Sequence, residues 1–558
     1  MANARSRDWL FGPGPDLLLG CGGGYLLVFG LLALQGPTIR AWLPLALIPL
    51  LVNSLLLPHY GATLIRVYEN RSDRRAYAFG AVWMTLLLAG VFIASLHSVL
   101  LGSLLVTVYL TWSPWHYSWQ NYGIAVLFLR RRDIAISGAA ARLLRLSFHA
   151  GLWLVWLALH GEASLGNYAP GAIRGDALRI LPLGIPAGPR DAAIVVAGIA
   201  YLGATAGAVA LLLRSAPWRK LIPTLLMLLT QGLWFGIPVL VRHFGWFSSI
   251  EPLSIEHATY TFMWIAMGHG TQYLWVSAYF FNARDRQRRY GRFLFRSLAV
   301  GAAAWTLPAL AFAPGLIGSI PFEAGLGLLV ASVVNIHHFI IDGEIWKLRS
   351  KPIAKILVQA GSGSNGTQNE HSSLHRYGWG ILTAAGVLAY AITMTETVER
   401  EVGIERAFSR GDLERVEQAA RHLAWLGFDG PEAHTRVGSL AVARNDLARA
   451  ARAFEHSLEL WPTAAAWTGL GYVRGQLRGD WNSALAAFRA ALDLDASYGE
   501  ALFHSGVAYL ELGLPERALE QLQAAERASP GLEKVRRALE RARAAVAPGA
   551  AKSRGPPP

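Results

Sequence analysis

The chain has 558 residues, of which 53% are hydrophobic and only 16% are charged. Soluble domains carry about a quarter charged residues, so this composition excludes an ordinary soluble enzyme for most of the chain and predicts a membrane protein. The formal net charge of +14 does not indicate nucleic acid binding, because the basic residues stand in short clusters between apolar runs. Cys21 is the single cysteine, which excludes an intrachain disulfide and a cysteine-based zinc site.

Apolar runs of about 20 residues, long enough to cross a bilayer, recur along residues 1–394. We predict eleven transmembrane helices, near residues 16–35, 41–58, 76–96, 98–118, 143–161, 191–213, 221–241, 258–281, 294–313, 322–341 and 377–394. The expected fold is therefore all-α, with a polytopic helical bundle over residues 1–394. The Gly- and Ser-rich stretch at 361–373 predicts a flexible linker before the last span.

Basic residues are distributed unevenly between the predicted spans. Alternate connections, beginning with the N-terminal segment, hold about five times as many Lys and Arg as the others. The other connections carry only Arg40, Arg174, Arg179, Arg190 and Arg242. The positive-inside rule then predicts a cytoplasmic N-terminus, as in a bacterial inner-membrane protein. Because the predicted number of spans is odd, residues 395 onward are expected on the outer, periplasmic face.

Residues 395–548 contain a repeat with a period of 34 residues. The stretches at 448–462 (ARAARAFEHSLELWP), 482–496 (NSALAAFRAALDLDA) and 516–530 (ERALEQLQAAERASP) are in register. Equivalent positions are Ala450, Ala484 and Ala518, then Phe454, Phe488 and Leu522, with the small residues Gly471 and Gly506 in the preceding helices. This pattern resembles the tetratricopeptide repeat, a helix-turn-helix unit of that period.

The resemblance implies an α-solenoid whose concave groove binds a protein or peptide partner. Bracing or dimerising the membrane domain is the alternative role. Weaker units near 406–423 and 532–547 are expected to cap the array, because terminal repeats must cover the core of their neighbours. Residues 549–558 are expected to form a disordered tail.

One predicted span ends in a cluster of residues that could bind a metal, in the stretch NIHHFIID. Asn335, His338 and Asp342 fall on one face of a helix, whereas His337 lies about 100° around it. Ionisable groups inside a membrane are costly and usually face the interior of the bundle. We therefore expect this face to point inward.

Three further spans carry a histidine with a polar neighbour. Gln120 follows His116 by four residues in WHYSWQ, and Tyr273 follows His269 by four residues in HGTQY. In the stretch LPHYGATLIR, His59 is expected at the inner end of its span. Under the predicted topology these histidines share roughly one depth in the membrane with the NIHHFIID cluster.

Imidazole nitrogens bind zinc, copper or iron, and a nearby carboxylate or amide orients them or completes the coordination. The predicted metal ligands are His59, His116, His269, His337, His338 and Asp342. Tyr273 and Gln120 are predicted to lie near the substrate. Three alternatives stay open: hydrogen bonds between helices, a proton path in a transporter, and haem held between His116 and His337 or His338.

The motifs PHY, WHY, HGTQY and HHFIID resemble those of histidine-rich integral membrane oxygenases. That group includes lipid desaturases, hydroxylases and bacterial carotene-cleaving dioxygenases. The resemblance covers the second to tenth predicted spans and implies iron, held by intramembrane histidines, and a lipid-like substrate. The repeated HxxxH and HxxHH boxes of desaturases are absent, which puts a di-iron site in doubt more than a mononuclear one.

The sequence thus predicts a metal-dependent membrane oxidoreductase, of the oxygenase or hydroxylase kind, joined to a tetratricopeptide domain. The alternative is a non-catalytic membrane scaffold or transporter whose repeats recruit a partner protein.

Overall fold

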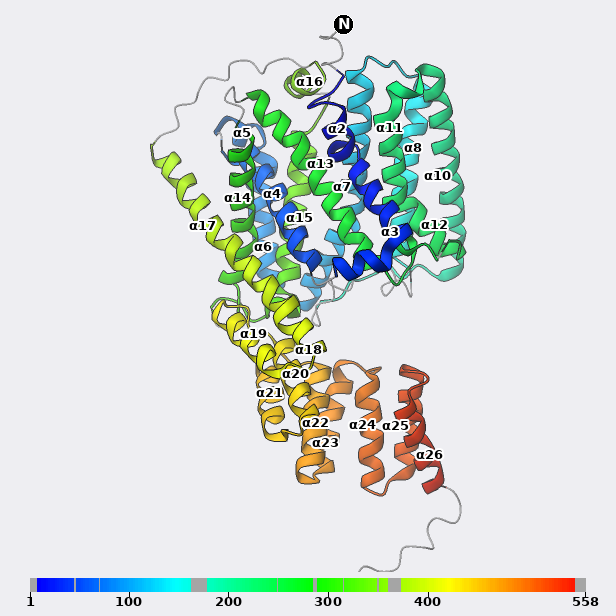
Figure 1. Cartoon of the computed structure of the whole chain (residues 1–558), viewed down its shortest axis with the longest axis vertical. Helices are drawn as coiled ribbons and strands as arrows, with labels where there is room; N and C mark the ends of the chain where they lie inside the picture. The colour runs from blue at the N-terminus through cyan, green and yellow to red at the C-terminus, as the bar shows by residue number, and fades with distance from the viewer. Residues whose placement is uncertain are drawn as a thin grey trace, which may run out of the picture. The chain divides into compact units, whose positions relative to one another are not determined.

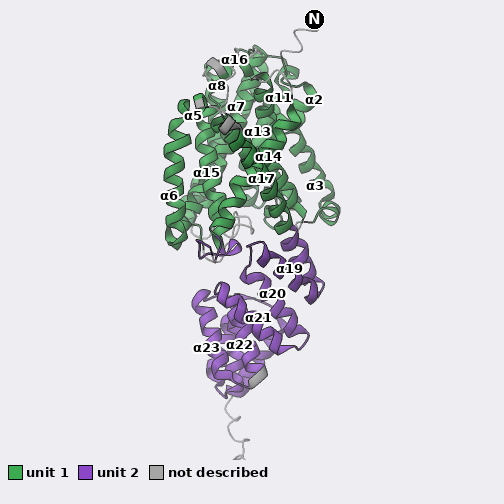
Figure 2. Ribbon diagram, turned by 90° about the vertical axis from the view of Figure 1, so that its left-hand side faces the viewer, with its two compact units in different colours: residues 1–312, 325–397 green, residues 313–324, 398–558 purple. Residues whose placement is uncertain are grey.

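The computed structural model describes residues 8–44, 47–69, 71–161, 178–247, 249–284, 289–314, 316–348, 351–359 and 373–546. Over these residues the chain is helical, without a β-strand, so the all-α prediction is confirmed. Two compact units are present (Figures 1 and 2): residues 1–312 with 325–397, called unit 1, and residues 313–324 with 398–558, called unit 2. The predicted tail at 549–558 and nearly all of the linker at 361–373 lie outside the described residues.

Long helices with short connections build unit 1. In chain order the helices up to the end of this unit are α2 (Pro13–Pro15), η1 (Asp16–Gly20), α3 (Gly23–Trp42), α4 (Ile48–Tyr68), α5 (Arg71–Ala76), η3 (Phe79–Met84), α6 (Thr85–Leu96), α7 (Val99–Arg131), α8 (Gly138–Leu159), α10 (Ala187–Ser215), α11 (Trp218–Gln231), η5 (Gly232–Gly236), α12 (Ile237–Phe244), η6 (Glu251–Leu253), α13 (Ala258–Arg284), α14 (Tyr290–Ala311), η7 (Phe322–Leu326), α15 (Gly327–Ile345), α16 (Lys351–Leu357) and α17 (Ser373–Val398). Figure 1 shows α2, α5 and α16 at one end of this unit.

By length and composition, eight helical segments of the described chain could cross a membrane. The number is nine if the pair Pro13–Gly20 and Gly23–Trp42, bent by 62°, forms one span. The predicted spans near 98–118 and 258–281 are absent from this set. They correspond to α7 and α13, helices of 33 and 27 residues that carry more polar side chains. The eleven-span count therefore stays a prediction.

The predicted bounds of the second span, 41–58, are wrong. The helix is α4, which begins at Ile48 and continues to Tyr68. The apolar run in the sequence stops before His59, but the helix goes on because His59, Tyr60 and Thr63 are all buried among neighbouring helices. His59 consequently lies near the middle of α4, not at its inner end.

Glycines bring α4 and α14 into backbone contact. A Cβ added to Gly61 would lie 1.8 Å from the carbonyl oxygen of Ser297, and one added to Gly301 would lie 1.7 Å from that of Leu57. Only residues without a side chain permit this approach. The contact therefore sets the rotation of α4, and with it the direction of His59.

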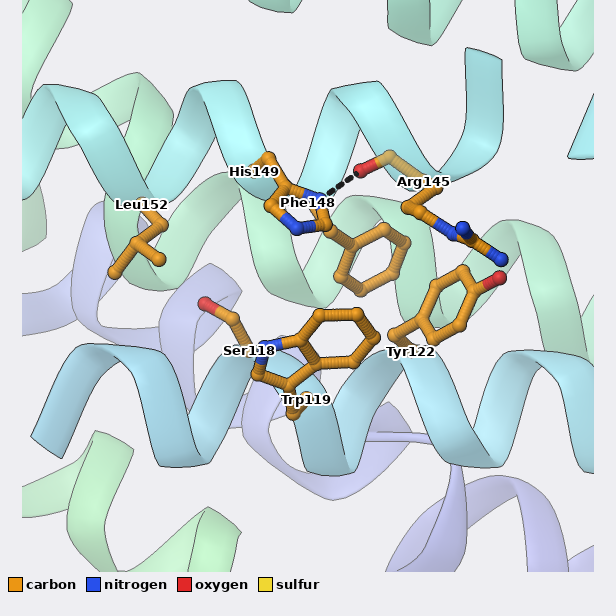
Figure 3. A pocket seen from close by; sticks show the side chains of 7 residues that line it. All are labelled: Ser118, Trp119, Tyr122, Arg145, Phe148, His149 and Leu152. Atoms are coloured by element: carbon orange, nitrogen blue, oxygen red, sulfur yellow. Dashed lines mark hydrogen bonds between the residues drawn. The ribbon is translucent and has the colours of Figure 1, made fainter. Parts of the chain in front are cut away.

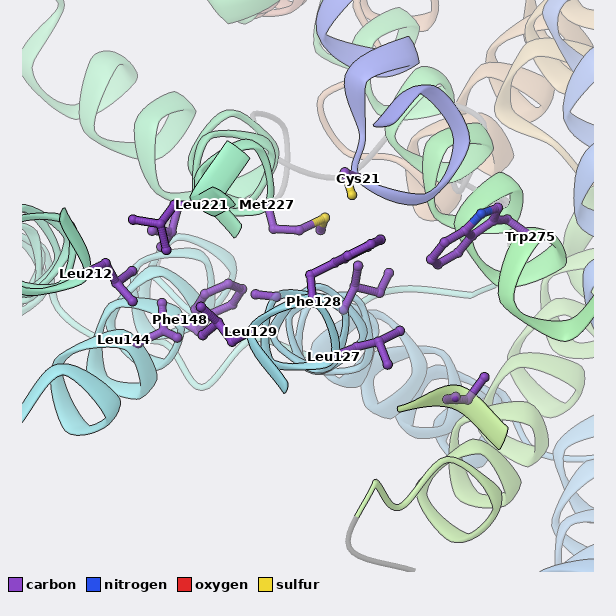
Figure 4. Packing of buried hydrophobic residues seen from close by; sticks show 14 of the residues in the cluster. Cys21, Leu127, Phe128, Leu129, Leu144, Phe148, Leu212, Leu221, Met227 and Trp275 are labelled. Atoms are coloured by element: carbon purple, nitrogen blue, oxygen red, sulfur yellow. The ribbon is translucent and has the colours of Figure 1, made fainter. Parts of the chain in front are cut away.

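The second half of α7 lies in a large apolar cluster of unit 1 (Figure 4). Phe128 of α7 stacks on Trp275 in this cluster, which also includes Leu212, Met227 and the fully buried Cys21. The cluster anchors the second half of α7, together with hydrogen bonds from Arg131 to the carbonyl oxygens of Leu357 and Trp9. Cys21 serves as a small packing residue.

Unit 2 continues the chain with η8 (Glu399–Arg406), α18 (Ala407–Ser409), α19 (Leu413–Trp425), α20 (Pro431–Ala443), α21 (Leu447–Leu460), α22 (Ala464–Arg478), α23 (Trp481–Leu494), α24 (Gly499–Glu511), α25 (Pro515–Ala528) and α26 (Glu533–Val546). The pairs α20/α21, α22/α23 and α24/α25 are three consecutive helix-turn-helix units. Their second helices begin 34 residues apart, at Leu447, Trp481 and Pro515.

The repeat positions pack as the sequence predicts. Ala450, Ala484 and Ala518 are fully buried, and a large residue follows each one at a second buried position. That residue fills the space left by glycines of the first helices: a Cβ on Gly471 would lie 2.6 Å from the Phe488 ring. The tetratricopeptide-like repeat is thereby confirmed as a fold. The predicted terminal units correspond to η8 with α19 and to α26.

Candidate metal centre

Four histidines from four helices meet in the interior of unit 1. They are His59 of α4, His116 of α7, His269 of α13 and His338 of α15. One nitrogen from each ring lies within 4.8 Å of the corresponding nitrogen of every other ring. The ring centroids of His59 and His338 are 4.2 Å apart, and those of His116 and His269 are 4.9 Å apart. Helices far apart in the sequence thus contribute to one compact group, called the four-histidine cluster below.

The ring nitrogens in this cluster largely lack hydrogen-bond partners. All four side chains are buried, with residue exposures of 7% or less. Both nitrogens of His59 and His269, and Nε2 of His116 and His338, are buried without a partner. A buried polar atom without a partner costs about 1–3 kcal/mol. One nitrogen from each of the four rings converges in one small volume, so the cluster offers several donors to a single bound group.

A chain of hydrogen bonds behind His338 determines which of its nitrogens carries the proton. The hydroxyl of Tyr273 donates to Oδ1 of Asp342 over 2.9 Å and lies 2.6 Å from the hydroxyl of Thr63. Thr63 in turn lies 2.8 Å from Nδ1 of His338. Because the Tyr273 proton is committed to the carboxylate, Thr63 donates to Tyr273 and accepts from Nδ1. Nε2 of His338 is then left with a lone pair directed into the cluster.

Asp342 lies at the edge of the cluster. Its Oδ2 is 3.5 Å from Nε2 of His338 and 3.8 Å from Nε2 of His116. These distances exceed those of a good hydrogen bond, so the oxygen points toward the two nitrogens without being paired with either. The carboxylate can therefore act as a fifth donor or as a partner of an adjacent group.

Aromatic rings cover the cluster on two sides. The Tyr117 ring stacks on His269 with centroids 3.9 Å apart, and the Phe339 ring stacks on His116 at 4.4 Å. Such stacking restricts the orientation of the His116 and His269 rings. The surroundings of the cluster on these two sides are therefore apolar.

A cavity of about 1100 Å³ reaches the cluster from one side. His116, Gln120, Tyr273 and Asp342 all line it. Most of its wall is apolar or aromatic, including Phe79, Trp112, Trp115, Trp119, Ile336 and Phe339. The lining also includes the exposed side chains of Arg130, Arg145 and Lys347. Ordinary ligand pockets measure about 300–1,000 Å³, so this cavity is large enough for a sizeable organic ligand.

Gln120 and Tyr273, the predicted substrate neighbours, both lie at this cavity. The Gln120 amide donates to the carbonyl oxygen of His269 over 3.2 Å and to Gln272 over 3.1 Å. Gln120 therefore holds the backbone of α13 beside the cluster. Tyr273, 1% exposed, joins the cavity to the hydrogen-bond chain of Thr63 and Asp342.

His337 lies outside the four-histidine cluster. Its Nε2 is 3.1 Å from the Tyr68 hydroxyl and 3.0 Å from the Thr85 hydroxyl. The angle of about 100° between successive helical residues turns it toward α4 and α6 when His338 faces inward. His337 therefore has hydrogen-bond partners of its own.

His149 belongs to another small site, between α7 and α8 (Figure 3). Its Nδ1 donates to the backbone carbonyl of Arg145 over 2.7 Å, and the ring lies beside Trp119. The void next to it measures about 10 Å³, room for one water molecule at most. The void by itself is too small for an organic ligand.

Sequence reasoning missed Thr63, which sets the protonation of His338, and Phe339, which covers His116. Thr63 follows His59 by four residues, so its position on the same helical face was a usable signal. Nothing in the sequence distinguishes Phe339 from an ordinary apolar residue of α15.

The residues present fit a first-row metal ion. Four neutral imidazoles with unshared nitrogens and one carboxylate oxygen are a donor set that such ions accept. The hydrogen bond from Nδ1 of His338 to Thr63 is the kind of contact that orients metal-binding histidines in proteins.

The fold defines an all-helical protein with a tetratricopeptide-like repeat unit. No protein-family model matches the chain, and no curated protein matches it. Among solved structures it is similar to YrrB, described as a tetratricopeptide protein with an unusual peptide-binding site, at 19% identity and a TM-score of 0.22, over 30% of this chain and 86% of that one. It is also similar to the APC/C hetero-tetramer Cut9-Hcn1, at 14% identity and a TM-score of 0.24, over 85% of this chain and 96% of that one.

Proposed function

We propose that this protein is a membrane-embedded, metal-dependent oxidoreductase of the oxygenase or hydroxylase kind that acts on a lipid-like substrate. The observation that carries the proposal is the set of unpartnered, buried nitrogens of His59, His116, His269 and His338, beside a large apolar cavity. The four histidines would hold the metal, and Asp342 would complete or adjust its coordination. Iron is the metal we propose, and it would supply the redox chemistry that such an enzyme needs.

The protein's own groups would divide the remaining work. The aromatic wall of the cavity would bind the apolar part of the substrate and exclude water. Tyr273 would hold a proton at its hydroxyl between Thr63 and Asp342, next to both the cavity and the cluster. His116 and Asp342 are the cluster residues that border the cavity, so the reacting carbon would lie beside them.

The charges along the cavity suggest how the substrate is oriented. Arg130, Arg145 and Lys347 are exposed members of the lining, whereas Trp112 and Phe339 belong to its apolar part. A lipid with a polar or acidic end would place that end near the cations and its hydrocarbon chain toward the cluster.

A bare ion suits the cluster better than haem. Two axial histidines of a haem require a flat slot between them that is wide enough for the macrocycle. Here the rings of His116 and His338 are 4.9 Å apart, and His59 and His269 occupy the flanks.

Two parts of the proposal concern the rest of the molecule. The chain would be an integral protein of a bacterial inner membrane with a cytoplasmic N-terminus and an outer repeat unit. The repeats would bind a protein or peptide segment. A non-catalytic scaffold or transporter with the same repeats is the alternative function.

The decisive experiment measures metal content and the absorption spectrum of the full chain purified in detergent. The variants are His338→Ala and, as a matched control on the same helix, His337→Ala. Removing His338 takes away a ligand, so the iron content should fall from about one ion per chain to a trace. Removing His337 should leave the metal in place, because its contacts are with Tyr68 and Thr85.

Stoichiometric iron that survives in His337→Ala and disappears in His338→Ala would support the proposal and justify a search for the lipid oxidised. A folded wild-type protein that binds no metal after iron is supplied would overturn it and favour the scaffold or transporter. A characteristic haem spectrum would overturn the bare-ion part alone.

A further inference from the structure

A second group of metal-binding side chains lies in unit 2, far along the chain from the four-histidine cluster. Asp429 precedes α20, His434 lies in the first turn of α20, and His456 lies in α21. One donor atom from each lies within 4.8 Å of the other two. We propose that Asp429, His434 and His456 form a zinc site in the first helix pair of the repeat unit.

The distances between the donor atoms are close to those that a zinc ion imposes. Oδ1 of Asp429 lies 2.8 Å from Nε2 of His434, and Oδ2 lies 3.6 Å from Nε2 of His456. Two donors on a tetrahedral zinc ion are about 3.4 Å apart, given bonds of about 2.0–2.1 Å. The first distance would lengthen by about 0.6 Å, as zinc replaces the hydrogen bond between Asp429 and His434, and the second would shorten by about 0.2 Å.

The two helices that carry the histidines are fixed against each other at the neighbouring positions. Thr435 follows His434, and its hydroxyl lies 2.9 Å from that of Ser457, which follows His456. Ser457 is fully buried and also donates to the carbonyl of Pro431 over 2.8 Å. The two helices are thus fixed against each other next to the two histidines.

The remaining donors are also oriented by neighbouring groups. The backbone N–H of Gly430 donates to Oδ1 of Asp429 over 3.0 Å. On the far side of His456, Nδ1 lies 3.3 Å from the carboxylate of Glu459. A carboxylate behind a histidine is a recurrent arrangement in zinc sites, because it fixes the tautomer and raises the basicity of the ligand nitrogen.

The number of converging donors separates this group from the other carboxylate–histidine pairs of unit 2. His422 contacts Glu399 at 2.8 Å, and Glu399 also accepts a hydrogen bond from Arg415. Arg415 is a cation without a lone pair, so it cannot be a metal ligand. At Asp429 the third member is instead a second imidazole, whose ring centroid lies 4.3 Å from that of His434. Three protein ligands with an exposed side at His456 leave a fourth position open to water or to a group of a bound partner.

A zinc ion here would join the segment before α20 to both helices of the first repeat. Metal binding would therefore stabilise the entry to the repeat array. The site does not depend on the proposed function of unit 1, because none of its residues belongs to that unit.

The test uses the full chain in detergent and zinc chloride as the probe. Zinc bound per chain is measured by elemental analysis after dialysis, and hydrogen exchange of residues 426–460 is measured with and without zinc. The variants are His434→Gln/His456→Gln and Asp429→Asn, which keeps the shape of the side chain. His422→Gln is the matched control, an exposed histidine that also contacts a carboxylate in this unit.

We expect the wild type and His422→Gln to bind one zinc ion per chain more than the double variant does. Zinc should slow hydrogen exchange in residues 426–460 at least several-fold in the wild type and His422→Gln. It should not slow exchange in His434→Gln/His456→Gln or Asp429→Asn. Equal zinc binding by the wild type and the double variant, or exchange in this segment that zinc leaves unchanged, would overturn the proposal. The exchange readout separates this site from zinc taken up by the four-histidine cluster.

Discussion

The hydroxyl of Thr63 lies 2.8 Å from Nδ1 of His338, and this contact gives His338 its tautomer. Nε2 is thereby left bare in the middle of the four-histidine cluster, where it has no hydrogen-bond partner. The contact joins α4 to α15, two helices that are remote in the sequence. A residue that touches no metal therefore decides whether one of the proposed ligands presents a lone pair.

Thr63→Val should weaken metal binding about 10- to 100-fold, as the loss of an orienting partner does in other metal sites. Valine keeps the shape of threonine but accepts no hydrogen bond. Thr63→Ser, which keeps the hydroxyl, should bind metal like the wild type. Competition with a chelator of known affinity measures the effect, and identical affinities for valine and serine would contradict it.

Gly301→Ala should destabilise unit 1 by about 1–3 kcal/mol or more, because the added methyl group would meet the backbone carbonyl of Leu57. The expected result is a lower thermal midpoint in detergent together with a lower metal content, since α4 carries His59. Gly203→Ala is the matched control: it is an exposed helical glycine with open space around its Cβ. Equal thermal midpoints for Gly301→Ala and Gly203→Ala would contradict this prediction.

Gly123→Phe should reduce the lipid that copurifies with the protein while leaving its metal content unchanged. Gly123 lines the large cavity, and its Cβ position is open, so a phenyl ring would occupy space meant for a substrate. Gly203→Phe places the same ring outside the cavity and serves as the control. Extraction and mass spectrometry of bound lipid provide the measurement, and equal lipid in both variants would argue against the cavity as the binding site.

Cysteine labelling in intact and permeabilised cells tests the predicted orientation. Ala135→Cys is exposed between α7 and α8, and Ala496→Cys is exposed between α23 and α24. A membrane-impermeant thiol reagent should label position 496 with the inner membrane intact and position 135 only after it is permeabilised. Cys21 is fully buried and should give little background. Labelling of both positions under the same condition would show that the chain crosses the membrane an even number of times between residues 135 and 496, against the odd number predicted.

Glu500 should make the stability of the last repeats depend on acidity. His504 and then Lys534 lower the pKa of Glu500 to about 2, against the opposing effect of desolvation. Because the folded pKa lies below the unfolded value of 4.5, the stabilisation is complete above about pH 4.5 and is lost as the pH falls toward 2. Glu500→Gln should therefore speed hydrogen exchange in α24 and α26 at pH 7, and the difference from wild type should shrink near pH 3. A difference that is the same at both values would contradict this.

The repeat unit could be predicted closely from the sequence. Its 34-residue period, its small and large buried positions and its terminal helices all follow from local pattern, since each helix packs mainly on its immediate neighbours in the chain. Asp429, His434 and His456 were not singled out, because their convergence depends on how two helices of one repeat are fixed by Thr435 and Ser457.

For the bundle, most of the helices and the residues that could bind a metal can be predicted from the sequence, although the bounds of α4 cannot. The sequence did not determine which of these residues meet. His337 and His338 are neighbours in the chain with the same chemistry, and a turn of about 100° sends one to Tyr68 and the other to the cluster. The rotation of each helix decides between them, and that rotation depends on contacts such as Gly61 and Gly301 between helices remote in the sequence. Only the tertiary structure contains that information, because side chains from α4, α7, α13 and α15 come together through packing and not through local pattern.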